Sequence, residues 1–488
     1  TGSGAFGIAR DSGTGLPYSI YDGTLEMIPG FNAWAEMDAL DYQIQSVSKA
    51  SWGLTFDPYS AEITAKTESV AGTTTTYGYD YSDLGQLEEV TKNSTIVEEY
   101  LYDANGNREY QKVNGIERWL SYDAEDRLEG IFSDEPKTVQ VADYDYDVDG
   151  FLTAKTDGSD VTTYDYSSLG ELLSVTLPDS TEIEYLHDAL GRRVAKKVDG
   201  DISEKYLWAG INQGLLAVYD GADNLILRFE YAGGRLPMAM TYDSATYYLA
   251  YDQVGSLRAV FDTSGNNVHE ISYDSFGNIL SDGGSLGITP PFGFAGGLHD
   301  RDTGLVRFGF RDYDPNNGRW TAKDPIGFAG GDVNLYAYVV ADPISFVDPS
   351  GERFGWNVVT SFAGGFWDSL QDNSYAAWHP FAPDAWERSS IGQAWANRDR
   401  YPVESYGAMA GAGAAVGATG AAVCIIGGET AVAGGGALFR PGGLVNSNRY
   451  LRVGIGRQEG WVFRIAGDWV ARFRSNPHID LFRIWWRK

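Results

Sequence analysis

Residues 307–351 decide the fold of this chain. They read Arg307-Phe-Gly-Phe-Arg-Asp-Tyr-Asp-Pro-Asn-Asn-Gly-Arg-Trp320, then Asp324-Pro-Ile-Gly-Phe-Ala-Gly-Gly-Asp-Val-Asn-Leu-Tyr-Ala-Tyr-Val339, then Asp348-Pro-Ser-Gly351. Two Asp-Pro-x-Gly sequences therefore begin at Asp324 and Asp348. Such sequences favour turns, because Asp accepts backbone hydrogen bonds and Gly adopts positive φ at low cost. Between them, residues 334–339 alternate as in a strand, so we expect two turns joined by a short aromatic strand.

The sequence before this stretch repeats itself. An aromatic residue or His is followed by Asp and, three residues after the Asp, by Gly; the clearest copies have Asp103, Asp147, Asp188, Asp252 and Asp274. Weaker copies contain Ser82, Asp123 and Ser167, and the steps from 82 to 188 are 20–24 residues. Trp208 and Tyr231 lie where copies are missing. A period of this length indicates a repeat architecture.

Each repeat has the pattern of a strand, a turn and a second strand. Large residues alternate with small or polar ones, as in Tyr77-Gly-Tyr-Asp-Tyr81, which is the period of a strand with two different faces. One hairpin is marginally stable alone, so the units must pair side by side. The sequence predicts a mainly β fold, in which the Tyr-Asp pairs pack and cap turns and do not catalyse.

These repeats and the 307–351 stretch resemble the Rhs or YD-repeat family, including the Rhs repeat-associated core segment and the C subunits of Tc toxins. The resemblance implies a repeat array coiled into a shell-like sheet at 1–300, a core-associated plug at 301–352, and a variable, cargo-like region at 353–488. It implies a polymorphic toxin or delivery protein whose shell encloses or presents a C-terminal effector. The alternative is a structural or adhesive protein of the cell surface or of a filament, with a non-enzymatic tail. Such a protein could also bind glycans.

The same resemblance implies an intramolecular aspartyl protease in the plug. Matched by motif, its two carboxylates are Asp324 and Asp348, Arg311 is the third member, and the scissile bond joins Glu352 to Arg353. Two close carboxylates share a proton, so one activates water while the other protonates the carbonyl oxygen. Glu352 departs from the apolar residue typical of relatives that cleave. Both self-cleavage and a cleavage-dead plug therefore remain open.

Composition limits the other chemistries. The chain has 488 residues with one cysteine, Cys424, which excludes an intrachain disulfide, and its five His are scattered. We expect no metal and no cofactor. Residues 353–488 hold 14 basic and 10 acidic residues, whereas the whole chain holds 37 and 67. The acidic repeats repel nucleic acid, and only the basic tail offers contacts to it.

The last part of the chain carries few motifs. The Gly/Ala-rich segment 407–438 is uncharged from 407 to 428, long enough for a membrane helix but also typical of a buried or loosely ordered linker. Residues 446–488 read as a small α+β or β extension. Its weak candidates for a toxin or nuclease-like site are Arg452, Arg464, His478 and Asp480; the alternative is a packed His and a turn Asp.

The partners follow from these alternatives. A toxin implies an immunity protein or a delivery-machine partner, and a scaffold implies self-assembly. We expect a secreted or cell-surface protein of bacterial type, although no signal peptide is visible at Thr1.

Overall fold

The computed structural model describes residues 6–33, 36–209 and 214–352, and, beyond these, the backbone of short strands between residues 355 and 486. Residues 1–30 and 37–359 form one compact unit, and residues 31–36 with 360–488 form a second. Repeats and plug therefore share a unit, while the boundaries at 300 and 352 stay predictions.

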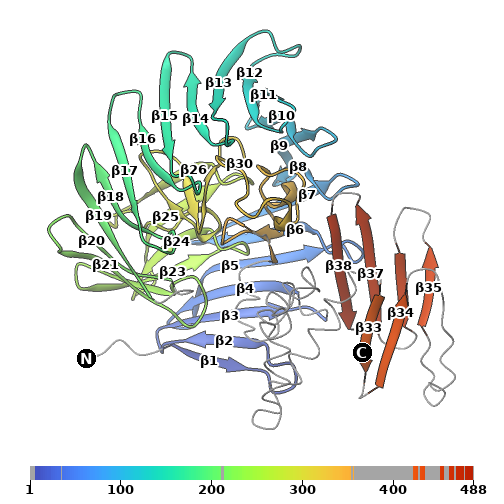
Figure 1. Ribbon diagram of the computed structural model, residues 1–488. Helices are drawn as coiled ribbons and strands as arrows, with labels where there is room; N and C mark the ends of the chain where they lie inside the picture. Colours follow the sequence, from blue (N-terminus) through green and yellow to red (C-terminus); the bar gives the residue numbers. More distant parts are fainter. Residues whose placement is uncertain are drawn as a thin grey trace. The chain divides into compact units, whose positions relative to one another are not determined.

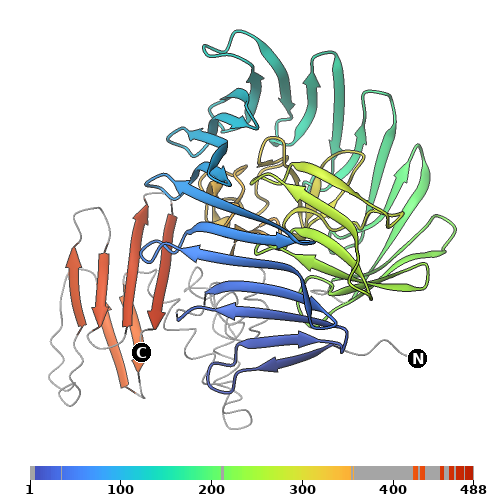
Figure 2. The same ribbon diagram turned by 180° about the vertical axis from the view of Figure 1, so that it is seen from behind.

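Twenty-six antiparallel strands of the first unit form one sheet, as predicted. β1 (Gly7–Arg10) pairs with β2 (Pro17–Tyr21), and β2 with β3 (Leu25–Phe31). From β4 (Met37–Ile44) to β26 (Ile279–Gly284), each strand pairs with the next along the chain. Among the described strands no pairing joins β26 to β1, so this sheet is open. The hairpins form a curved fan in Figures 1 and 2.

The remaining strands of this sheet are β5 (Val47–Phe56), β6 (Ile63–Val70), β7 (Thr73–Tyr81), β8 (Leu87–Lys92), β9 (Thr95–Tyr102), β10 (Arg108–Val113), β11 (Ile116–Tyr122), β12 (Leu128–Phe132), β13 (Gln140–Tyr146), β14 (Leu152–Asp157), β15 (Asp160–Tyr166), β16 (Leu172–Thr176), β17 (Glu182–His187), β18 (Arg193–Val198), β19 (Asp201–Trp208), β20 (Leu215–Tyr219), β21 (Leu225–Glu230), β22 (Ala239–Tyr242), β23 (Ala245–Tyr251), β24 (Leu257–Asp262) and β25 (Asn267–Tyr273).

The repeat motif forms the turns between strands. Asp103 Oδ1 accepts the backbone N–H groups of Asn105 at 2.8 Å and Asn107 at 2.9 Å, and Gly106 has φ of 82°. The same two-bond cap recurs at Ser82, Asp123, Asp147, Ser167, Asp188, Asp252 and Asp274. The predicted turn chemistry is confirmed.

Several repeat aromatics also tie their hairpin to the preceding one. The Tyr102 hydroxyl donates to the Leu87 carbonyl at 2.8 Å, and Tyr122 donates to the Arg108 carbonyl at 2.8 Å. Trp208 Nε1 and the Tyr231 hydroxyl make the equivalent bonds, each 2.7 Å, to the carbonyls of residues 193 and 215. The two residues therefore occupy the missing copies of the repeat.

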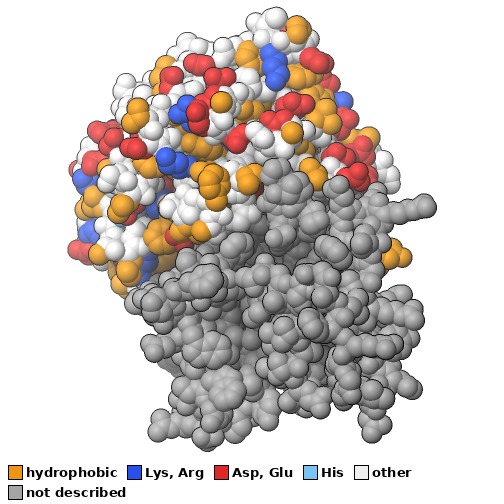
Figure 3. Space-filling model, turned by 45° about the vertical axis from the view of Figure 1, so that its right-hand side comes forward, with side chains coloured by type: hydrophobic (Ala, Val, Ile, Leu, Met, Phe, Trp, Pro, Cys, Tyr) orange, Lys and Arg blue, Asp and Glu red, His pale blue; other side chains and the backbone are white. Residues whose placement is uncertain are grey.

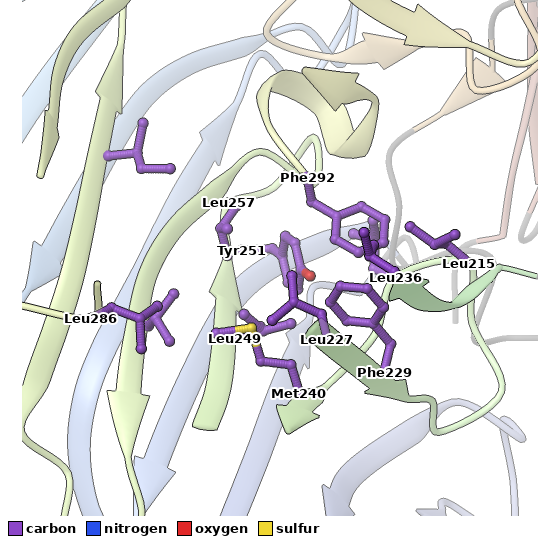
Figure 4. Close-up of a cluster of buried hydrophobic side chains, with 13 residues drawn as sticks. Leu215, Leu227, Phe229, Leu236, Met240, Leu249, Tyr251, Leu257, Leu286 and Phe292 are labelled. Carbon is purple, nitrogen blue, oxygen red and sulfur yellow. The ribbon is translucent and has the colours of Figure 1, made fainter. Parts of the chain in front are cut away.

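Apolar side chains on the inner face of the sheet form the core. Around Leu249, Met240 and Leu257, all fully buried, lies a cluster drawn from β20 to β25 and completed by Phe292 (Figure 4). The Phe229 and Phe292 rings meet edge to face at 5.1 Å. Burying each such side chain stabilises the fold by about 1.5–3 kcal/mol. On the outer surface, charged and hydrophobic side chains are interspersed (Figure 3).

The plug, residues 301–352, packs an aromatic centre inside the curve of the sheet. It continues a small sheet of β27 (Leu298–His299), β28 (Val306–Phe308), β29 (Arg311–Asp314) and β30 (Arg319–Trp320). Three short 3₁₀ turns, η1 (Phe294–Gly296), η2 (Gly327–Gly330) and η3 (Val339–Ala341), are the helical elements of the described residues. Tyr313 and Tyr338, both buried, have ring centroids 4.5 Å apart.

The expected strand over residues 334–339 is wrong. Asn334 Oδ1 accepts the N–H of Tyr336 in a turn, and residues 339–341 have positive φ. What remains of strand geometry is an isolated bridge between Ala337 and Arg319. The alternation arises because Tyr336 and Tyr338 are both buried in the plug, not because they lie on one face of a strand.

Hydrogen bonds fasten the plug to shell hairpins far apart in sequence. Arg319 donates to Asn107 at 2.8 Å, the Tyr336 hydroxyl to the Gly150 carbonyl at 2.7 Å, and Arg193 to Asp312 at 3.0 Å. The gold plug lies between the blue and green strands in Figures 1 and 2. The sheet therefore curves around the plug.

The second unit is described only through its strands. β33 (Ala421–Ile426) pairs with β34 (Glu429–Gly434), and β35 (Leu451–Ile455), β36 (Trp461–Ile465), β37 (Trp469–Asn476) and β38 (Ile479–Trp486) form an antiparallel sheet. β33 lies inside the uncharged 407–428 segment, so residues 421–426 form a strand and are not part of a helix. The rest of that segment lies outside the described residues, and the membrane interpretation stays a prediction. Within the described part of the chain no helix is long and apolar enough to cross a bilayer.

Candidate active site

Arg311 joins the two carboxylates that the sequence singled out. Its Nη2 lies 2.9 Å from Asp324 Oδ2 and 3.2 Å from Asp348 Oδ2. All three side chains are buried, with exposed fractions of 4% to 8%. One nitrogen thus brings together two carboxylates 24 residues apart in the sequence, and all three residues line one pocket.

Two glycine turns explain how Arg311 reaches Asp348. Gly309, with φ of 45°, follows β28, and a Cβ there would lie 2.2 Å from the Ser350 carbonyl oxygen. Gly351, with φ of 68°, would place a Cβ 2.5 Å from the Phe308 carbonyl oxygen. Only glycine permits this φ at low cost together with such close backbone contact. The turn after Asp348 therefore lies directly against the turn that precedes Arg311.

Asp348 holds the chain at the expected scissile bond. Its Oδ1 accepts the N–H of Gly351 at 2.9 Å and that of Glu352 at 3.2 Å, and also the Ser350 hydroxyl at 3.0 Å. Its other oxygen, Oδ2, accepts a hydrogen bond from Arg311 Nη2 at 3.2 Å. The carboxylate therefore fixes the backbone one residue before the Glu352–Arg353 bond.

The surroundings of Asp324 favour its protonated form. Burial raises the pKa of Asp324 to about 6, the Arg311 charge opposes this rise, and the carboxylates of Asp348 and Glu352 add to it. Its Oδ1 accepts the N–H of Ile326 at 2.9 Å. A carboxyl group with a raised pKa beside one that is fully hydrogen-bonded is the arrangement that lets one group donate a proton and the other accept one.

The carbonyl of Glu352 lies close to Asp324. A Cβ added at Gly330 would be 2.6 Å from Asp324 Oδ2 and 2.9 Å from the Glu352 carbonyl oxygen, so these two oxygens lie within about 5.5 Å of one another, the sum of the two distances. One water molecule fits between groups at such a separation. Because Gly330 has no side chain, space remains between the Asp324 carboxyl group and the Glu352 carbonyl oxygen.

Sequence reasoning named four residues of this pocket, and three of the others bear on its chemistry. The indole of Trp320 stacks on the Arg311 guanidinium, whose Cζ lies 4.1 Å from the ring centroid. Asp332 also lines the pocket, and burial raises its pKa. Gly330 is the third. Trp320 ends the quoted stretch and Gly330 begins a Gly-Gly pair, but neither signal indicates a role without the fold.

Of the other candidates, the structure brings only Arg452 and Arg464 together within its described residues. Arg353 and His478 lie outside them. Arg452 on β35 is the register partner of Arg464 on β36, and Asp480 on β38 lies opposite Ser475. Their roles, like those of Asp324, Asp348 and Arg311, stay predictions. Across the described positions, no group of three His, Cys, Asp or Glu residues has the geometry of a metal site.

Comparison with known families decides what kind of shell this is. The family model of the teneurin YD-shell matches residues 1–344. The chain belongs to the teneurin YD-shell family. The YD-repeat resemblance of the sequence is thereby confirmed, and the open, curved sheet is a YD shell.

Curated relatives match more than half of this chain. Teneurin-3 of Danio rerio is 32% identical over 287 residues, which are 56% of this chain and 10% of that protein. Teneurin-4 of Homo sapiens is 30% identical over a match that covers 60% of this chain and 10% of that protein. The tRNA3(Ser)-specific nuclease WapA of Bacillus spizizenii is 28% identical over 58% of this chain and 12% of its own length. The chain thus spans about a tenth of the length of these relatives.

Among solved structures, the Photorhabdus luminescens Tc holotoxin pore superposes with a TM-score of 0.42 and 14% identity, over 71% of this chain and 21% of that chain. The TcdB2-TccC3 structure without its hypervariable C-terminal region superposes with a TM-score of 0.33 and 15% identity, over 71% of this chain and 25% of that chain.

Proposed function

We propose that this YD shell carries the chain after Glu352 as a C-terminal effector, and that its plug releases the effector by hydrolysing the Glu352–Arg353 bond. The observation that carries the proposal is the contact of one guanidinium, Arg311, with Asp324 and Asp348 beside the Glu352 carbonyl. The reaction is intramolecular, so each chain cuts itself once.

The chemistry needs one protonated and one ionised carboxyl group. Asp348 takes a proton from a water molecule whose oxygen bonds to the Glu352 carbonyl carbon, while Asp324 gives its proton to the carbonyl oxygen. The resulting diol gives a hydroxyl proton back to Asp324 as its C–N bond breaks, and the nitrogen of Arg353 takes the proton that Asp348 holds. The products are a carboxyl group on Glu352 and an amino group on Arg353. Arg311 keeps the two carboxylates in place and offsets their charge.

The effector assignment is supported by the WapA relative and by charge. That relative is a nuclease by name, and residues 353–488 have four more basic than acidic residues within an otherwise acidic chain. A basic segment suits a substrate with phosphates. An effector of this class acts outside the cell that makes it, which fits a secreted or surface-exposed shell, a delivery partner and an immunity protein.

Incubation of the purified chain tests the proposal. Intact-mass measurement over time should show fragments 1–352 and 353–488 from the wild type, and neither from Asp348→Asn or Asp324→Asn. Asp149→Asn, in an exposed turn, is the control and should cut like the wild type. If the wild type stays intact at every pH from 4 to 8, the plug is a structural cap, and the scaffold or adhesive role becomes the better account.

A further inference from the structure

We propose that Glu352 makes this cleavage dependent on acid: its ionised side chain holds the site inactive, and its protonation allows the bond to break. The inference rests on the proposed function and adds its regulation. It assigns the side chain that precedes the scissile bond a role separate from that of the two catalytic carboxylates.

The first observation is the charge of the pocket. Its lining contains four carboxyl groups, on Asp324, Asp332, Asp348 and Glu352, and one cationic side chain, Arg311. Arg311 lies within 3.2 Å of both Asp324 and Asp348. One positive charge therefore faces up to four negative ones in a buried space, where like charges cannot all ionise cheaply.

The second observation is the place of Glu352. Its N–H donates to Asp348 Oδ1 and to the Ser350 hydroxyl oxygen, each at 3.2 Å, so its backbone is held in the site. Its charge acts on both neighbours, because it raises the pKa of Asp324 and works against the burial that lowers the pKa of Arg311. Arg311, Asp324 and Asp348 are therefore the groups that interact with Glu352, and Asp332 lines the same pocket.

These two observations give the direction of the effect. Hydrolysis builds negative charge on the Glu352 carbonyl oxygen, and a second negative charge on the same residue opposes it. At a separation of about 5 Å and an effective dielectric constant of about 20, such repulsion slows a reaction on the order of 100-fold. Protonation of Glu352 removes this repulsion. The active site then needs two protons, one on Asp324 and one on Glu352.

This proton count gives a measurable signature. For a reaction that needs two protons, the rate falls about 100-fold for each pH unit above both pKa values, and for one proton it falls about tenfold. We expect the steeper fall for the wild type and the shallower one for Glu352→Gln, whose amide is neutral. We also expect Glu352→Gln to cut at least tenfold faster than the wild type at pH 8.

The experiment measures self-cleavage rates by intact mass from pH 4.5 to 8.5. The wild type is compared with Glu352→Gln, and with Glu129→Gln, which carries the same exchange on an exposed strand residue and should match the wild type. Equal slopes for the wild type and Glu352→Gln, with cleavage in both, overturn acid gating and leave the protease. No cleavage by any variant at any pH overturns the protease and the gating together.

Discussion

Arg193 of β18 and Asp312 of β29 form an ion pair of 3.0 Å although 119 residues separate them. Asp312 also forms an ion pair with Arg307, whose Nη1 lies 2.7 Å from Asp312 Oδ2. All three side chains are at most 4% exposed. Asp312 directly follows Arg311, and successive side chains of a strand point to opposite faces. One face of β29 thus reaches the candidate active site and the other is fixed to the shell.

Asp312→Asn should therefore loosen the plug. The change leaves Arg193 and Arg307 buried without their shared negative charge, which costs about 3–5 kcal/mol for broken buried pairs. Urea unfolding should show this loss of unfolding free energy, and Asp149→Asn should stay within about 0.5 kcal/mol of the wild type. A loss below about 1 kcal/mol for Asp312→Asn would mean that the pair does not hold the plug.

Tyr144 tests the repeat aromatics. Its ring is buried among Leu128, Ile131 and Leu152, and its hydroxyl donates to Asn317 of the plug at 3.1 Å. We expect Tyr144→Ala to lower the unfolding free energy by roughly 3 kcal/mol or more, and Tyr144→Phe by about 1 kcal/mol. Leu169→Ala, at a turn tip that is 77% exposed, is the control. Equal midpoints for Tyr144→Ala and Leu169→Ala would contradict the packing assigned to Tyr144.

Stability should fall as the pH rises from about 4 to 7. Burial raises the pKa of Asp342 to about 7, against an ordinary value near 3.8. Between these values the folded chain keeps a proton that the unfolded chain has lost, so the stabilisation present at low pH disappears through this window. A shift of this size is worth roughly 4 kcal/mol.

Asp342→Asn should flatten that dependence. The variant keeps an oxygen that accepts the N–H groups of Ile344 and Ser345 but has no proton to lose. Denaturation midpoints measured at pH 4, 6 and 8 should change less in Asp342→Asn than in the wild type. Parallel pH curves for the two proteins would show that Asp342 does not cause the trend.

Gly330 gives a test of the pocket that leaves every charge in place. Its φ lies outside the left-handed region, so alanine fits the backbone, but the added Cβ would lie 2.6 Å from Asp324 Oδ2. We expect Gly330→Ala to slow self-cleavage at least tenfold with little loss of thermal stability. Gly53→Ala, where nothing lies within 4 Å of the added Cβ, should cut normally. Full activity in Gly330→Ala would place the reacting groups elsewhere.

The sequence predicted the repeats because their signal is local. Asp103 and Gly106 form their turn within four residues, and the same pattern recurs often enough to be recognised. Trp208 and Tyr231 could be placed by spacing alone, since Tyr231 keeps the tyrosine of the motif and the Trp208 indole donates the equivalent hydrogen bond.

The plug was harder to predict because its contacts are not local. Asp324, Asp348 and Arg311 were named from a motif resemblance, and nothing in their spacing indicated that a single nitrogen would touch both carboxylates. The strand expected at residues 334–339 failed for the same reason. Its aromatic residues are buried by the surrounding shell, so their alternation reflects tertiary packing rather than strand pairing.

The central claim is that Asp324 and Asp348 cut the chain after Glu352, and one comparison tests it most directly. Glu352→Leu removes the third carboxylate, and its purified chain should separate within the incubation into fragments whose masses end at residue 352 and begin at residue 353. The double variant Glu352→Leu with Asp348→Asn should stay whole under the same conditions. An intact Glu352→Leu chain, or equal cleavage in both proteins, would contradict the account.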